Sequence, residues 1–179
     1  MFAEKFTLTG EASNHNSILG RYTKDEIWKN LRAGSYNEGL LIICDEEKYG
    51  PSTLEEWSHL VGDQALPIAI TAWGDVFCVS FTQKRFLFLF AQENKVTDLG
   101  QSIIPFFDNL LVDEGLKRSL LDYDRYNQVK GRLGPLPYGS CYILKPYQIL
   151  GGDQKALENY TIGDNQIYLS MVAQTHTQI

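Results

Sequence analysis

Histidine, cysteine and carboxylate side chains are the groups in this 179-residue chain that could carry acid–base, nucleophilic or metal chemistry. Their spacing forms none of the common arrangements, because the sequence contains no HExxH, CxxC, GxSxG or Walker phosphate-loop pattern. His59 is the only histidine within an expected helix. An exposed helical position is the preferred interpretation of His59, with a general base as the alternative. The sequence therefore predicts no catalytic residue, no cofactor and no metal site.

Two groups of carboxylates could still act together in the folded chain. The stretch from Asp108 to Asp124 interleaves acids with Lys and Arg, a mixture typical of a helical surface with ion pairs. The run Asp45-Glu46-Glu47 could bind a hard cation, but no loop of alternating oxygen ligands surrounds it. A small hydrolase or nucleotide-binding enzyme with dispersed carboxylates therefore stays as an alternative.

The distribution of charge points to a class of partner. The net charge is −6, and the acidic excess lies in the first third of the chain, in Asp45-Glu46-Glu47, Glu55-Glu56 and Asp63. Neutralising phosphates requires clustered Lys and Arg, so this balance argues against direct nucleic-acid binding. An acidic surface is better suited to attracting a basic protein, with a merely solvated surface as the alternative.

Helices and one buried run must position these acids. Residues 1–22 lack periodicity and predict a loose N-terminal arm. A short helix is expected from Thr23 to Gly34, with capping-box spacing at its start, and a second over residues 53–61. The apolar run at residues 39–44, directly before Asp45, is either a strand or a helical turn.

The spacing of apolar residues changes from helical to β-type at Leu66. Residues 66–72, 76–81 and 85–90 are β-rich runs separated by short turns, which predicts an antiparallel meander with a possible fourth strand near Val96. Trp73 lies in the first turn, where its ring can pack across the turn or stand exposed as a binding anchor.

Helical periodicity returns after Gly100. Three helices are expected before residue 134, the second capped by Asp113. A strand over residues 140–146, a helix over 153–160 and a last strand or helix over 166–173 follow. We therefore predict an α+β fold with an antiparallel sheet of about four to six strands and helices packed against it. Its parts are the arm at 1–22, an α+β half at 23–99 and a helical and β half at 100–179, with the two halves sharing one core.

Neither a membrane span nor a disulfide framework is expected. The longest apolar runs are five or six residues, whereas a membrane-spanning helix needs about 20. No signal peptide is recognisable, so a cytoplasmic location is expected. Cys44, Cys78 and Cys141 are widely spaced among apolar neighbours and are expected to be buried free thiols.

Three ordered segments resemble a bacterial family. The first is Gly39 to Asp45 with the following Tyr49 and Leu54-Glu-Glu-Trp57, and the second is Pro67 to Asp75, entering a hairpin. The third is Leu133 to Gly139 with Cys141-Tyr142, Pro146 and Leu150-Gly-Gly152. Together they resemble the GAD-related proteins with a Tdi-type C-terminal domain, the immunity proteins paired with type VI secretion DNase effectors. The resemblance covers roughly residues 20–174 and implies a GAD-like part in 23–99 and a Tdi-type part in 100–179.

The resemblance implies a protein that acts by binding and has no catalytic residues. Its partner would be a cognate secreted toxin, a basic nuclease whose active or DNA-binding surface it covers. The candidate toxin-facing residues are Asp45, Glu46, Glu47, Glu55, Glu56 and Trp73. The oligomeric state is not predicted, and a homo-oligomeric scaffold is a further alternative to the enzyme.

Overall fold

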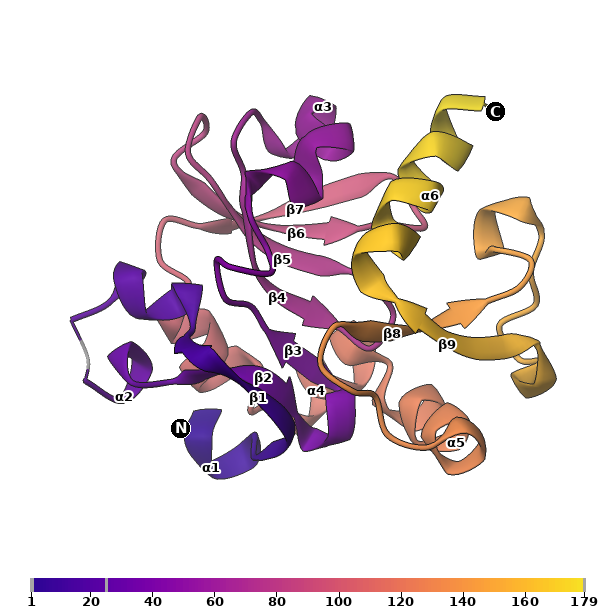
Figure 1. Ribbon diagram of the computed structural model, residues 1–179, viewed down its shortest axis with the longest axis horizontal. Coiled ribbons are helices and arrows are strands. Elements are labelled where there is room, and N and C mark those ends of the chain that lie inside the picture. The colour runs from indigo at the N-terminus through magenta and orange to yellow at the C-terminus, as the bar shows by residue number, and fades with distance from the viewer. Residues whose placement is uncertain (1, 25, 179) are drawn as a thin grey trace.

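One antiparallel sheet organises the computed structural model, which describes residues 2–24 and 26–178, apart from the side chains of Ala3, Glu11, Ala12 and Leu110 (Figure 1). Within these residues its seven strands follow one another in chain order as a meander. They are β1 (Leu8–Asn16), β2 (Arg32–Tyr36), β3 (Leu41–Ile43), β4 (Leu66–Thr71), β5 (Val76–Ser80), β6 (Arg85–Phe90) and β7 (Lys95–Gly100). The predicted α+β class and the meander are confirmed, and the sheet is larger than the four to six strands expected.

The extra strands come from segments that the sequence did not mark as β. Residues 1–22 were expected to form a loose arm, but Leu8–Asn16 pairs with Arg32–Tyr36 at the edge of the sheet. The Asn37 amide stabilises this edge by accepting from the Thr7 N–H and donating to the Lys5 carbonyl, both at 2.8 Å. Backbone pairing and this amide determine the strand, so hydrophobic periodicity gave no signal for it.

Helices flank the sheet. They are α1 (Phe2–Lys5), α2 (Glu26–Lys29), α3 (Ser58–Val61), α4 (Glu114–Leu121), α5 (Tyr123–Leu133) and α6 (Asn165–Gln178). Short 3₁₀ segments are η1 (Ile18–Tyr22), η2 (Asn37–Gly39), η3 (Pro51–Trp57), η5 (Gln148–Leu150) and η6 (Leu157–Asn159), and η4 (Phe106–Leu110) is a π-helical turn. Asp113 caps α4 as predicted, because its carboxylate accepts from the Leu116 N–H at 2.9 Å. None of these helices is long and apolar enough to cross a membrane.

A small second sheet joins the C-terminal segment to the main one. Strands β8 (Ser140–Leu144) and β9 (Tyr160–Asp164) pair with each other, and the Tyr142 N–H donates to the Ala72 carbonyl just after β4 at 2.8 Å. The expected helix over 153–160 is instead a turn followed by η6, since Tyr160 already begins β9. Figure 1 shows this small sheet and α6 together at one end of the molecule, with α1 and α2 toward the other.

The buried core joins residues from both predicted halves. The ring of Phe77 in β5 packs against that of Phe88 in β6 with 4.3 Å between ring centres, and the Phe107 ring of η4 lies 5.3 Å from that of Phe77. Burying such a side chain stabilises the fold by roughly 1.5–3 kcal/mol. The three cysteines are buried free thiols, as predicted.

Candidate functional site

Asp45 begins the acidic run, but its side chain points into the protein. It is only 2% exposed, and its carboxylate accepts from the Tyr138 hydroxyl at 2.7 Å and from the Lys48 N–H at 2.8 Å. Burial opposes ionisation, but hydrogen bonds from Ser13, Lys48 and Tyr138 outweigh it and lower the pKa of Asp45. Asp45 therefore links the loop after β3 to the segment before β8, and almost none of its side chain is exposed at the surface.

Replacing Asp45 with alanine is expected to lower the free energy of unfolding by about 1–3 kcal/mol, because the Tyr138 hydroxyl and a backbone N–H lose their acceptor. Glu47→Ala is the matched control, since Glu47 is exposed and its replacement should leave stability nearly unchanged. Urea denaturation at neutral pH measures both. Equal stability of the two variants would contradict the structural role of Asp45.

Trp73 packs across its turn, which is the first of the two alternatives expected from the sequence. The ring is 8% exposed, and its Nε1–H donates to the Leu121 carbonyl at 2.8 Å. The Arg125 guanidinium lies 4.2 Å from the ring centre. Trp73 thus joins the β4–β5 turn to the end of α4 and to α5, and does not stand exposed as an anchor.

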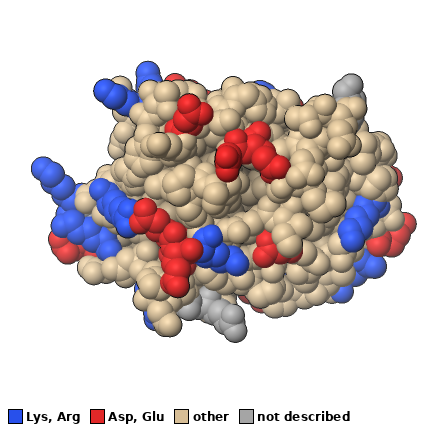
Figure 2. Space-filling view, turned by 45° about the horizontal axis from the view of Figure 1, so that its top comes forward, with Lys and Arg blue, Asp and Glu red and all other residues tan. Residues whose placement is uncertain are grey.

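The four glutamates of the candidate set are exposed but lie in two environments. Glu46 forms an ion pair with Arg21, and the Glu47 carboxylate contacts the His15 ring. Glu55 and Glu56 belong to η3, where Glu56 accepts from the Gln174 side-chain amide of α6 at 3.0 Å. Figure 2 shows acidic and basic side chains together at the left of this face, and a second acidic group without basic neighbours nearer its centre. Arg21 therefore offsets the charge of Glu46, whereas no Lys or Arg described in the structure forms an ion pair with Glu47, Glu55 or Glu56.

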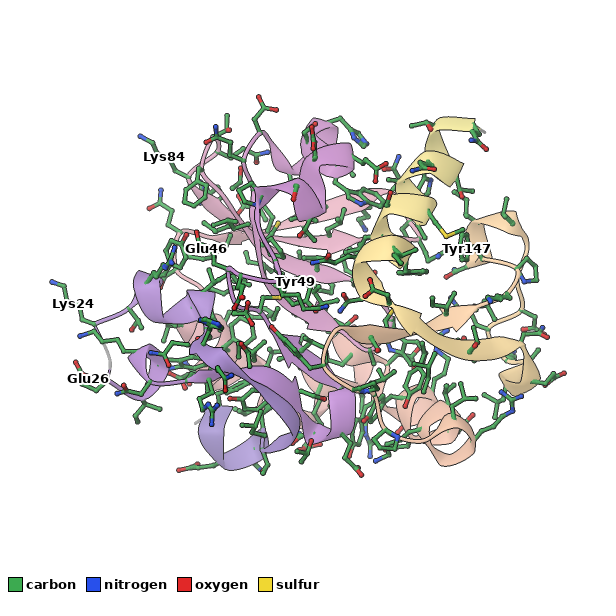
Figure 3. All side chains as sticks on the ribbon, in the orientation of Figure 1. Lys24, Glu26, Glu46, Tyr49, Lys84 and Tyr147 are labelled. Atoms are coloured by element: carbon green, nitrogen blue, oxygen red, sulfur yellow. The ribbon has the colours of Figure 1, made fainter. Side chains whose placement is uncertain are left out.

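Helix α6 carries exposed apolar side chains that sequence reasoning missed. Ile167 is 63% exposed and Met171 50% exposed, one turn apart on the same face, and Gln174 follows on that face. The Tyr147 hydroxyl donates to the Met171 sulfur at 3.6 Å, and Figure 3 shows Tyr147 between α6 and the loop that contains η5. We call Ile167, Met171, Gln174, Glu55 and Glu56 together the α6–η3 surface.

The amino-acid pattern could not identify this surface, because α6 is apolar on more than one side. Tyr168, Leu169, Val172 and Ala173 form its buried face, and Ile167 and Met171 lie among them in the sequence. Only the packing of α6 against η3 and the β8–β9 sheet distinguishes buried from exposed positions. The described residues contain no group of three or more His, Cys, Asp or Glu that could hold a metal ion.

The family comparison concerns the C-terminal part of the chain. Residues 101–176 match the family described as "T6SS immunity protein Tdi1, C-terminal", and this segment contains α4, α5, the β8–β9 sheet and most of α6. Residues before 101, where the GAD-like part was expected, lie outside the match. A comparison with curated proteins found no match.

A solved structure resembles the whole chain. The crystal structure of Atu4351 from Agrobacterium tumefaciens superimposes with a TM-score of 0.64, covering 97% of this chain and 89% of that chain at 18% sequence identity. At this identity the likeness concerns the fold. The segment 101–176 therefore carries the similarity to type VI secretion immunity proteins, and it includes Ile167, Met171 and Gln174 of the α6–η3 surface.

Proposed function

We propose that this protein is an immunity protein that binds a cognate type VI secretion toxin in the cytoplasm and neutralises it without catalysis. The match of residues 101–176 to the Tdi1 C-terminal family is the observation that carries the proposal. The toxin is a nuclease, specifically a DNase, whose active or DNA-binding surface the immunity protein covers. The excess of acidic over basic residues supports a basic partner of this kind.

The α6–η3 surface is the proposed contact. Protein interfaces commonly have an apolar centre inside a polar rim, with few residues providing most of the binding free energy. Ile167 and Met171 supply exposed apolar area, and Gln174, Glu55 and Glu56 supply the polar margin. Most of α6 belongs to the matched segment, so the apolar centre lies where the family similarity lies.

Reversing both charges of η3, as Glu55→Lys with Glu56→Lys, is expected to slow association with the toxin about tenfold at low salt and less at high salt. The cause is repulsion of the basic nuclease surface before contact forms. Stopped-flow or surface plasmon resonance at two salt concentrations measures the effect. The matched control is Glu46→Lys with Glu47→Lys, which changes the net charge by the same amount in the loop after β3, where Arg21 already pairs with Glu46. A larger effect of the control would place the contact at the loop after β3.

A pull-down with the secreted protein encoded beside this one tests the function itself, followed by calorimetry and a nuclease assay on the complex. Nanomolar binding that abolishes DNA cleavage is the expected result. Folded protein that neither binds nor inhibits that toxin would overturn the proposal, and the α+β fold would stand without it.

A further inference from the structure

A pocket of about 240 Å³ opens where the turns after β4 and β6 meet α4, α5, α6 and the β8–β9 sheet. None of the α6–η3 surface residues belongs to its wall. The aromatic side chains in the wall are Trp73, Phe90, Tyr142, Tyr160 and Tyr168, and its charged side chains are Asp75, Glu93, Asp122 and Arg125. Pockets for drug-sized ligands measure roughly 300–1,000 Å³, so this one suits a group about as large as a single side chain.

The basic residue of the pocket already has partners. Arg125 forms an ion pair with Asp122 at 2.7 Å, and its guanidinium lies over the Trp73 ring. No described Lys or Arg forms an ion pair with Asp75 or Glu93. The pocket therefore contains two carboxyl groups whose negative charge has no paired cation in the described part of the chain.

Asp75 is the more buried of these two groups. Its Oδ1 accepts from the Ala91 N–H at 2.9 Å, which is the one hydrogen bond that described residues donate to this carboxyl. The pKa of Asp75 is raised to about 7, mainly because burial disfavours the ionised carboxylate; the hydrogen bond from Ala91 and the charge of Arg125 oppose this shift, and the nearby Glu93 adds to it. Ionised Asp75 would be stabilised by a cation entering the pocket, since the protein itself supplies little compensation.

We propose that this pocket binds an organic cation, namely a protonated amine or a guanidinium on an aliphatic stem. Asp75 and Glu93 would form charge-assisted hydrogen bonds with the cationic head, and the aromatic rings would contact the stem and attract the charge through their faces. Such a group has two sources, a Lys or Arg side chain of the partner or a free small molecule. The proposal concerns the pocket alone and does not depend on the proposed immunity function.

Calorimetric titration of the full chain with butylguanidinium and n-butylammonium tests the pocket, with 1-butanol as the neutral probe of similar stem. Both cations are expected to bind and the alcohol is not. Asp75→Asn should weaken cation binding about tenfold or more, and Glu93→Gln by a smaller factor, since a charge-assisted bond is lost in each. Glu158→Gln, an exposed change on η6 outside the wall, is the matched control and should leave affinity unchanged.

Two results would overturn the proposal: equal binding of alcohol and cations, or wild-type affinity in both Asp75→Asn and Glu93→Gln. Circular dichroism of each variant verifies folding, and the exposed Glu93 position keeps the test usable if Asp75→Asn does not fold. Repeating the titration on the toxin complex distinguishes the sources. Butylguanidinium that competes with the toxin indicates a toxin side chain, whereas binding to the intact complex indicates a free cation. If the chain binds the cations but does not bind the toxin, the pocket proposal is supported and the immunity function is refuted.

Discussion

Replacing Ile167 and Met171 together with glutamine is expected to weaken toxin binding about a hundredfold or more. Each side chain would lose apolar contact of roughly 1.5–3 kcal/mol, and every 1.4 kcal/mol is about tenfold in affinity. The double variant should fold with nearly unchanged stability, because both side chains are at least half exposed in the free protein and glutamine is a good helix former. Calorimetry with the cognate toxin measures the affinity, and urea denaturation measures the stability.

The matched control for the α6 variant is Phe81→Gln. Phe81 is another exposed large apolar residue, but it lies directly after β5 in the turn before β6, outside the α6–η3 surface. Its replacement should not change toxin affinity. If Phe81→Gln weakened binding and the α6 double variant did not, the contact surface would have to be moved to that turn.

The sheet was predictable wherever local sequence determined it. The β-rich runs from Leu66 to Phe90 alternate with short turns, and they form β4, β5 and β6 as expected. Gly74 shows why the first turn needs glycine: its φ is +83°, and a Cβ there would lie 2.3 Å from the ring of Tyr168. By contrast, β1 is a polar edge strand that depends on β2 and Asn37, so its residues gave no β signal.

The candidate site was less predictable, because burial of its residues depends on distant parts of the chain. Asp45 and Glu46 are sequence neighbours that are both acidic. Asp45 is buried because it accepts a hydrogen bond from Tyr138, 93 residues away, whereas Glu46 stays on the surface and pairs with Arg21. The burial of Trp73 likewise depends on a distant residue, because its Nε1–H donates to the Leu121 carbonyl. The sequence marks all of these acids alike, and only tertiary contacts distinguish the exposed Glu55 and Glu56 from the buried Asp45.

Asp75→Asn is expected to raise the free energy of unfolding by about 2–4 kcal/mol near pH 8. The pKa of Asp75 is about 7 in the folded protein, raised by burial from 3.8. Between these values the folded state binds more protons than the unfolded state, so wild-type stability falls as pH rises through this window. Asparagine cannot ionise and can still accept from the Ala91 N–H. The free energy of unfolding of the variant should therefore not fall as pH rises through this window. At about pH 4 the carboxyl is largely protonated in the folded state, and the two proteins should differ little.

Urea denaturation of both proteins across this pH range measures the difference. Comparing variant with wild type cancels groups common to both, including Asp45, whose lowered pKa gives the opposite slope as pH falls. The other ionisable groups around Asp75 are Glu93 after β6, Asp122 and Arg125 at α5, Cys141 and Tyr142 of β8, Tyr160 of β9 and Tyr168 of α6. If the free energy of unfolding depends on pH in the same way in both proteins, ionisation of Asp75 does not destabilise the fold. A stabilised variant that has also lost cation binding would show that Asp75 costs folding free energy and serves recognition, as is common for functional groups with perturbed pKa values.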